Sequence, residues 1–298
     1  MIVVYSLQDW DCAGAGGIAV GEIPSENLPP ICYYADGLKR RICSSVCGFW
    51  LLLSVVSAWG QRSEPAPAIA KDFAAIPARV APPCIVIGFV GGFVAHNNLH
   101  HSEVQLAEDL RKQYPWGVYV QTFENHHGEK AYKQILRLLD ANHDGKLSAP
   151  EKQSARIIFY GHSWGGSEAV HLARILGAQG IPVLLTVQVD SVAKRGQNDG
   201  VIPANVAQAA NFYQPHGLVR GRAKIRAADP SRTRIVGNFR FDYAKEPIRC
   251  EQYPWWDRFL VRAHTEIECD PRVWNRVEEL IRSQLPPLNS EVSAFPPD

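Results

Sequence analysis

Apolar residues between positions 84 and 284 form two kinds of pattern, short continuous runs and stripes at helical spacing. The continuous runs, which are typical of buried strands, lie at 84–87 and 157–160. Residues 118–123 and 182–189 are mostly apolar and also predict strands, and 233–236 is a weaker one. The stripes, which predict helices, lie at 102–114, 131–139, 167–176 and 271–284. Strands that alternate with helices predict an α/β fold, in which a mostly parallel sheet carries helices on both faces. Residues 202–223 show neither pattern, and we expect an insertion between strands there.

The first 83 residues follow a different pattern. Three basic residues at 39–41 precede a charge-free apolar stretch that ends in Val56-Ser57-Ala58, so residues 39–58 are typical of a signal peptide, with an uncleaved anchor as the alternative. Residues 59–83 are rich in Pro and Ala and predict a linker to a catalytic domain at 84–298. Residues 1–38 are an unusual N-terminal extension, which suggests an over-long gene model. A secreted or periplasmic protein is expected, with membrane contact only through an uncleaved segment.

Composition narrows the classes of partner. The chain has 298 residues, 46% of them hydrophobic, and balances 31 basic against 30 acidic residues without a long run of either sign. A nucleic-acid interface needs clustered Lys and Arg, so nucleic acid is excluded as a partner. One catalytic domain acting on a small molecule fits these numbers.

The strand predicted at 157–160 runs directly into Gly161-His162-Ser163-Trp164-Gly165, and a predicted helix follows. A serine with glycines on both sides at a strand-to-helix turn is lifted above the sheet, where its hydroxyl is accessible. We therefore identify Ser163 as the candidate nucleophile.

A serine hydroxyl needs a base, and the base needs a carboxylate that fixes its tautomer. His264 is the favoured base because it lies just before the last predicted helix, where a long loop can return it to Ser163. Asp190 is the favoured acid, since it ends the apolar strand 182–189. Asp242, which follows the weaker strand, stays open as the alternative acid.

An oxyanion hole requires backbone N–H groups near the reacting carbonyl. Trp164, the residue after the nucleophile, is expected to supply one of these groups. The loop Gly88-Phe89-Val90-Gly91-Gly92 follows the first strand, and Phe89 is expected to supply the other.

From Ile87 onward the chain resembles the α/β-hydrolase superfamily, particularly its lipase-like members. The resemblance is carried by the glycine-rich loop at 87–92, by Gly-His-Ser-Trp-Gly-Gly at 161–166 and by the order Ser, Asp, His. It implies a nucleophile, acid and base at Ser163, Asp190 and His264. An acid directly after the strand that follows the nucleophile resembles the pancreatic-lipase arrangement, whereas most of the superfamily places it one strand later. The chain reaches its first loop early, so we expect a sheet without the two leading strands of the full fold.

A second motif lies at 140–151 and matches the twelve-residue EF-hand calcium loop. Gly145 permits the tight turn, and the exit helix is expected to be short because a strand begins near residue 157. The expected ligands of a structural Ca²⁺ are Asp140, Asn142, Asp144, Lys146 through its carbonyl, Ser148 through water, and Glu151.

These features together predict a serine hydrolase that cleaves a small-molecule or lipid carboxylic ester without an organic cofactor. An amidase or thioesterase with the same triad, or an inactive calcium-binding protein on a hydrolase scaffold, are the alternatives. The aromatic cluster at 253–259 is a candidate pocket wall. Cys250 and Cys269 either form a disulfide around His264 or remain free thiols.

Overall fold

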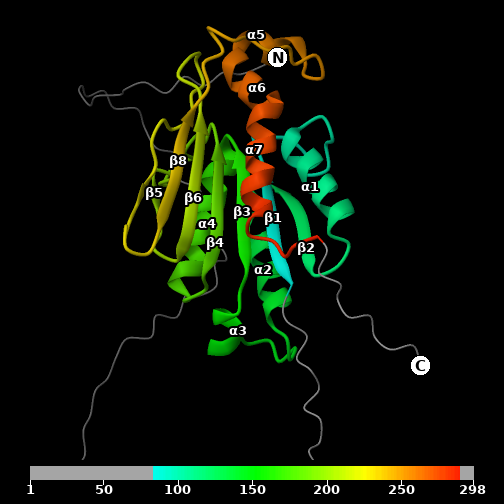
Figure 1. The fold of residues 1–298 in the computed structure, drawn as a ribbon, viewed down its shortest axis with the longest axis vertical. Helices are drawn as coiled ribbons and strands as arrows, with labels where there is room; N and C mark the ends of the chain where they lie inside the picture. Colours follow the sequence, from blue (N-terminus) through cyan, green and yellow to red (C-terminus); the bar gives the residue numbers. More distant parts are fainter. Residues whose placement is uncertain (1–82, 289–298) are drawn as a thin grey trace, which may run out of the picture. The chain divides into compact units, whose positions relative to one another are not determined.

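Six strands, every neighbouring pair of them parallel, form the main sheet of the computed structural model, which describes residues 83–288 (Figure 1). Their order across the sheet is β2-β1-β3-β4-β6-β8. These six strands are β1 (Cys84–Val90), β2 (Val118–Glu124), β3 (Ile157–His162), β4 (Val183–Val189), β6 (Val206–Tyr213) and β8 (Arg234–Arg240). Two short strands, β5 (Val201–Ile202) and β7 (Arg226–Ala227), pair separately.

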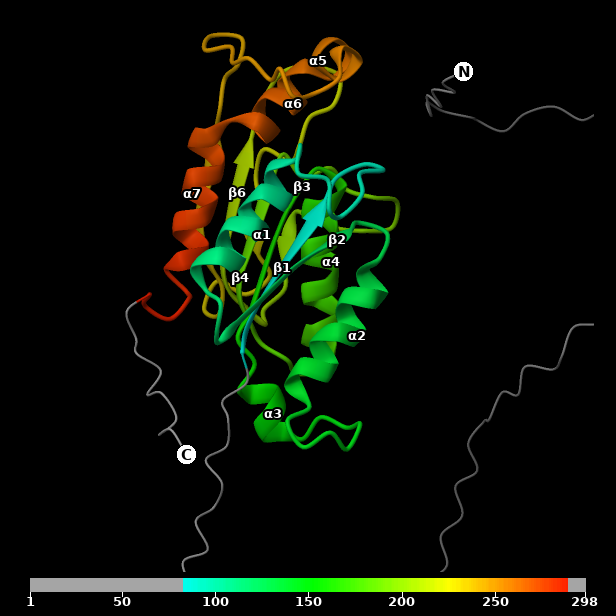
Figure 2. The same ribbon diagram turned by 90° about the vertical axis from the view of Figure 1, so that its right-hand side faces the viewer.

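Helices cover both faces of this sheet, as Figure 2 shows. One face packs against α1 (Ser102–Gln113) and α7 (Pro271–Arg282), and the other against α2 (Gly128–Leu139) and α4 (Trp164–Ala178). The central strands β1 and β3 are buried along their whole length, because alternate side chains enter the two cores. The expected α/β class, a mostly parallel sheet with helices on both faces, is confirmed.

The remaining helices are α3 (Ala149–Gln153), α5 (Trp255–Leu260) and α6 (Arg262–Cys269). The five residues of α3 agree with the expected short exit from the 140–151 loop. In Figure 1, α3 lies at one end of the fold, and α5 and α6 lie at the other, beyond the carboxyl ends of the strands. Within the described residues β1 is the first strand, and it leads directly into the glycine-rich loop, as expected of a shortened sheet.

The prediction of an insertion at 202–223 is wrong for its first half. Residues 206–213 form β6, which pairs with β4 on one side and β8 on the other. The strand escaped the pattern because its sequence, Val-Ala-Gln-Ala-Ala-Asn-Phe-Tyr, has few β-branched residues. Asn211 is fully buried there, and its amide donates to the Arg222 carbonyl and to Asn238. Contacts with neighbouring strands and loops therefore stabilise β6, whose own sequence is only weakly hydrophobic.

The expected N-terminal extension, signal or anchor at 39–58, and linker up to residue 82 lie outside the described residues. Among the residues that are described, no helix is long and apolar enough to cross a membrane.

Candidate active site

Ser163 occupies the sharp turn between β3 and α4. Its backbone has φ 55° and ψ −125°, a conformation that side-chain-bearing residues rarely adopt. The turn is possible because two glycines let the backbones meet. A Cβ on Gly165 would lie 2.0 Å from the Phe89 carbonyl oxygen, and one on Gly161 would lie 2.5 Å from the Gly165 carbonyl carbon. The backbone therefore holds Ser163 above the carboxyl end of the sheet.

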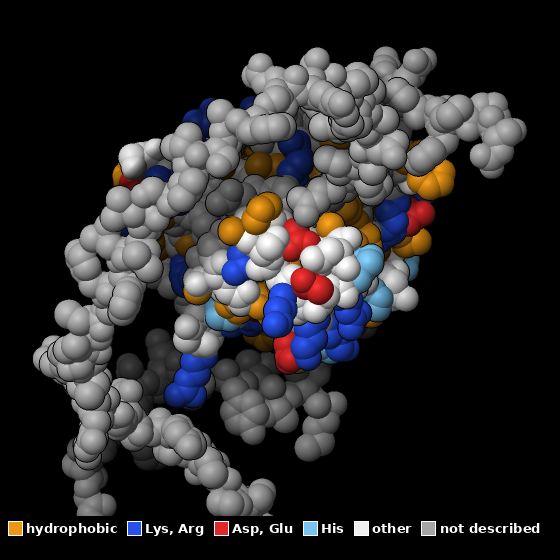
Figure 3. Space-filling model, turned by 90° about the horizontal axis from the view of Figure 1, so that it is seen from below, with side chains coloured by type: hydrophobic (Ala, Val, Ile, Leu, Met, Phe, Trp, Pro, Cys, Tyr) orange, Lys and Arg blue, Asp and Glu red, His pale blue; other side chains and the backbone are white. Residues whose placement is uncertain are grey.

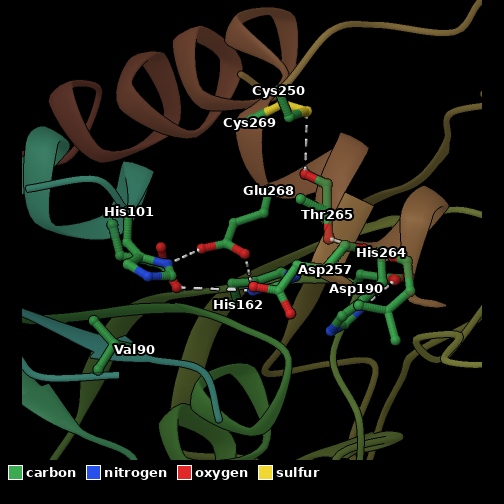
Figure 4. A network of polar contacts seen from close by, with 12 residues as sticks. Val90, His101, His162, Asp190, Cys250, Asp257, His264, Thr265, Glu268 and Cys269 are labelled. Carbon is green, nitrogen blue, oxygen red and sulfur yellow. Dashed lines mark hydrogen bonds and ion pairs between the residues drawn. A yellow bond between two sulfur atoms is a disulfide. The ribbon is translucent and has the colours of Figure 1, made fainter. Parts of the chain in front are cut away.

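His264 and Asp190 form a buried pair beside this turn. His264 Nδ1 lies 2.6 Å from Asp190 Oδ2, and Figure 4 shows the two side chains together. Asp190 is fully buried directly after β4, at φ 41°. His264 lies on α6, not in the long loop that the sequence suggested. The geometry gives the imidazole an acceptor at Nδ1 and leaves Nε2 as the nitrogen that can accept a proton.

Three further donors orient the Asp190 carboxylate. Its Oδ2 accepts from the Gln214 side chain at 2.8 Å, and its Oδ1 accepts from the backbone N–H of Gly221 at 2.8 Å and that of Gln214 at 3.3 Å. A Cβ on Gly221 would lie 2.2 Å from the Asp190 carbonyl carbon, so this approach requires glycine. Sequence reasoning missed both residues, because only the fold brings the segment 214–221 against Asp190.

Asp242, the alternative acid, lies with different partners. It accepts from His216 Nε2 at 2.8 Å and from Arg240 at 2.9 Å, and no hydrogen bond or ion pair of the described residues joins it to His264. The structure brings Asp190, and not Asp242, to the candidate base.

Ser163 and His264 line one cavity of about 150 Å³. Within the described residues no direct hydrogen bond joins their side chains, and catalytic hydrogen bonds often tighten only when substrate binds. Ser163 and His264 are nearly buried, at 8% and 9% exposure, so few water molecules can reach their hydrogen-bonding groups.

The two expected oxyanion donors come from different elements, β1 and α4. Trp164 is the first residue of α4, where a backbone N–H has no intrahelical acceptor. Phe89 is buried within β1, and its carbonyl faces the turn glycines. Gly91 approaches Ser163 closely: a Cβ there would lie 3.0 Å from Ser163 Cβ. Phe89 and Trp164 stay predictions, and Gly91 is a further loop residue at the nucleophile.

A second polar cluster, which the sequence did not reveal, adjoins the triad. His162, the residue before Ser163, packs against His264 with ring centroids 4.4 Å apart and ring planes tilted by 36°. Its Nδ1 lies 3.4 Å from Glu268 Oε2 and 3.9 Å from Glu103 Oε1. His101 Nδ1 contacts the other oxygen of Glu268 (Figure 4). We call His101, Glu103, His162 and Glu268 the His–Glu cluster.

Burial dominates the electrostatics of the His–Glu cluster. It lowers the pKa of His162 to about 4, against the opposing charge of Glu268. Burial, and then the charge of Glu268, raise the pKa of Glu103 well above its ordinary value. Burial alone would also raise the pKa of Glu268, but His162 and His101 outweigh it and leave that pKa below its ordinary value. The two carboxyl groups are therefore driven to different protonation states.

The aromatic cluster is only in part the pocket wall that was expected. Tyr253 is buried and lines the cavity with Ser163. Trp255 and Phe259 are 68% and 78% exposed on α5, so these two do not wall the cavity. Cys250 and Cys269 form a disulfide with a Cα–Cα distance of 5.9 Å, which resolves the open alternative and ties the segment before α5 to the end of α6.

The 140–151 loop has the internal hydrogen bonds of a closed turn. Asp140 accepts from the N–H groups of Asp144 and Gly145 at 3.2 and 2.9 Å, and Gly145 has φ 78°. Glu151 accepts from Ala141 N–H at 3.0 Å and forms a capping box with Ser148. These bonds, first that from the Ser148 hydroxyl, lower the pKa of Glu151.

Figure 3, which views the α3 end of the fold, shows acidic side chains among Lys and Arg side chains. The loop's oxygens bond its own N–H groups, and Asn142 Nδ2 donates to Asp144. Calcium binding by Asp140, Asn142, Asp144, Lys146 and Glu151 stays a prediction.

Comparison with known proteins adds little to this geometry. No protein-family model and no curated protein matches the chain. A similar solved structure is a provisionally assigned hydrolase of the α/β superfamily from Xanthomonas campestris pv. campestris, which is 12% identical with a TM-score of 0.31, covering 67% of this chain and 98% of that one. The likeness is too low to argue activity from, so the assignment of function depends on the site itself.

Proposed function

We propose that this chain is a serine hydrolase that cleaves carboxylic esters through an acyl-enzyme. The observation that carries the proposal is the buried His264–Asp190 pair, 2.6 Å apart, in the same cavity as a serine held at the strained strand-to-helix turn. A structural role alone explains neither the positive φ of Ser163 nor a buried aspartate surrounded by donors.

The geometry supports a two-step reaction. Ser163 Oγ attacks the ester carbonyl carbon while His264 Nε2 takes the hydroxyl proton, and Asp190 stabilises the imidazolium that forms. The carbonyl oxygen becomes negative and accepts from backbone N–H groups of Trp164 and the 88–92 loop. The tetrahedral intermediate expels the alcohol, which receives the proton from His264. Water, deprotonated by the same nitrogen, then releases the acid and restores Ser163.

A groove of about 440 Å³ adjoins the site at Gly92. Phe93 and Trp164 form one wall with their rings edge to face, 5.6 Å between centroids. Lys194 and Arg195 lie along it as well. This volume suits a ligand of small to medium size with an apolar part, and the aromatic pair offers that part a surface. The ester is accordingly a small molecule or a lipid fragment. The location that we propose for the enzyme, secreted or periplasmic, depends only on the signal-like sequence at 39–58.

A pair of serine variants tests the proposal. A fluorophosphonate probe should label the wild-type chain, and p-nitrophenyl esters of graded chain length should reveal its acyl preference. Ser163→Ala should lose both, with kcat below about a thousandth of wild type. The control is Ser167→Ala, four residues further along α4, whose hydroxyl donates to Gln197 and should not be needed for labelling.

Two results would replace the proposal. Turnover of an amide or thioester series in preference to esters would keep the triad but move the chain to the amidase or thioesterase class. A folded wild-type chain that neither reacts with the probe nor turns over any of the three series would make it an inactive binding protein.

A further inference from the structure

The His–Glu cluster brings together side chains from three separate elements behind the nucleophile. His101 and Glu103 lie at the start of α1, His162 ends β3, and Glu268 is near the end of α6. Figure 4 shows Glu268 between His101 and His162, with a dashed contact to each. Neither the fold nor the triad needs two carboxylates here, so the cluster requires its own explanation.

The cluster places two carboxyl groups in a buried site. Glu103 is fully buried, and Glu268 is 7% exposed. Among the described residues no Lys or Arg forms an ion pair with either carboxylate, and histidines are their only ion-pair partners. Burying a carboxylate without a permanent cation is costly, so the site favours whatever supplies positive charge.

The hydrogen bonds of the cluster do not satisfy all of its buried polar atoms. Neither oxygen of Glu103 has a hydrogen bond of good geometry in the described part of the chain, although the backbone N–H groups of Glu103 itself and of Gly91 lie close to this carboxyl group. One proton shared by Glu103 and Glu268 is the competing arrangement, and it would use a single oxygen of each carboxyl group. A cation bound between the carboxylates can use oxygens of both.

The spacing of the cluster fits a metal ion. His101, Glu103 and Glu268 each offer a ligand atom, and these atoms lie within 4.8 Å of one another. His162 Nδ1 is 3.4 and 3.9 Å from the nearest oxygens of Glu268 and Glu103. Ligand atoms on a tetrahedral zinc ion, at bonds of about 2.0–2.1 Å, are about 3.4 Å apart.

We propose that the His–Glu cluster is a divalent transition-metal site that takes zinc, with His101, Glu103 and Glu268 as ligands and His162 as the fourth. Mixed imidazole and carboxylate ligands suit zinc better than calcium, which prefers oxygen alone. The ion neutralises the buried carboxylates and joins α1 to α6, the helix that bears His264. Its site opens into the Ser163 cavity, which His101 and Glu268 also line. The proposal does not depend on the activity proposed above.

Zinc binding by the full chain is the direct test. Chelator-treated protein, dialysed with Zn²⁺ in the presence of excess Ca²⁺ to fill the 140–151 loop, should retain one zinc per chain by elemental analysis. Zinc at a hundredfold excess over its Kd should raise the melting temperature by about 5–10 °C. Glu103→Gln and Glu268→Gln keep the side-chain shape and should each weaken zinc binding by more than the about 10- to 100-fold that loss of an outer-shell partner costs.

The chain offers a matched control on its surface. Glu124 also lies between two histidines, His96 at 2.7 Å and His127 at 2.6 Å, but its oxygens are satisfied and His96 is half exposed. Glu124→Gln should leave zinc binding unchanged. His101→Gln, at the partly exposed edge of the cluster, provides a milder variant if either buried substitution prevents folding.

Either of two results overturns the proposal. The first is a folded wild-type chain that retains no zinc and shows no thermal shift, which would leave the shared proton as the explanation of the cluster. The second is zinc that survives in the Glu103, Glu268 and His101 variants or disappears in Glu124→Gln, which would place the ion elsewhere.

Discussion

Every group within hydrogen-bonding distance of the Asp190 carboxylate is a donor, which makes Asp190→Asn a sharp test of the triad. Oδ2 faces the side chains of His264 and Gln214, and Oδ1 faces two backbone N–H groups, those of Gln214 and Gly221. An asparagine NH₂ therefore meets donors in either orientation. If the NH₂ group faced the backbone N–H groups of Gln214 and Gly221, two hydrogen bonds would be lost. We therefore expect the NH₂ group to face His264.

That orientation forces His264 into the wrong tautomer. Its Nδ1 must accept from the amide, the proton moves to Nε2, and Nε2 can no longer take the proton of Ser163. We expect kcat to fall by about 10⁴, equivalent to about 5 kcal/mol of lost transition-state stabilisation. The Gln214 side chain loses one acceptor but still donates to the Val219 carbonyl at 2.9 Å, so the cost is at most about 1–3 kcal/mol and the variant should still be folded at 25 °C.

The assay compares kcat on the best p-nitrophenyl ester with circular dichroism at the same temperature. Asp242→Asn is the matched control, because its partners His216 and Arg240 are about half exposed and neither contacts His264, and it should stay within about twofold of wild type. A folded Asp190→Asn variant that keeps more than a hundredth of wild-type kcat would refute the reasoning, as would a larger loss in Asp242→Asn.

Three further outcomes follow from the same geometry. Gly221→Ala should push the Asp190 backbone aside and lower kcat about 100-fold in a folded protein, and unchanged kcat would mean that this close approach does not matter. Cys250→Ser should remove the disulfide with Cys269 and cost about 3 kcal/mol of stability, seen as a lower melting temperature that reducing agent no longer changes. Calcium at a hundredfold excess over Kd should stabilise the wild type by about 2.7 kcal/mol. Asp140→Asn keeps an acceptor for the loop's N–H groups but loses a charge, so its melting temperature should respond far less to calcium. A wild-type melting temperature that neither EDTA nor calcium changes would exclude calcium binding by this loop.

The sequence alone was sufficient where the decisive residues are neighbours in the chain. The strand–turn–helix at Ser163 needs glycines within two residues of it, and the short exit helix α3 was expected because a strand begins near residue 157. Continuous apolar runs marked the central strands β1 and β3, because strands buried on both faces need apolar side chains at successive positions. These are local rules, and tertiary packing did not override them.

Only the tertiary structure decided the questions that depend on which distant segments meet. Asp190 and Asp242 both follow strands, but β6 lies between β4 and β8, and so only the carboxylate after β4 reaches His264 on α6. The strand β6 itself was invisible, since its alanines and amides are buried by partners and not by their own hydrophobicity. The His–Glu cluster joins residues up to 167 positions apart, from His101 to Glu268. No spacing along the chain signals such a meeting, because it arises from helix packing against the sheet.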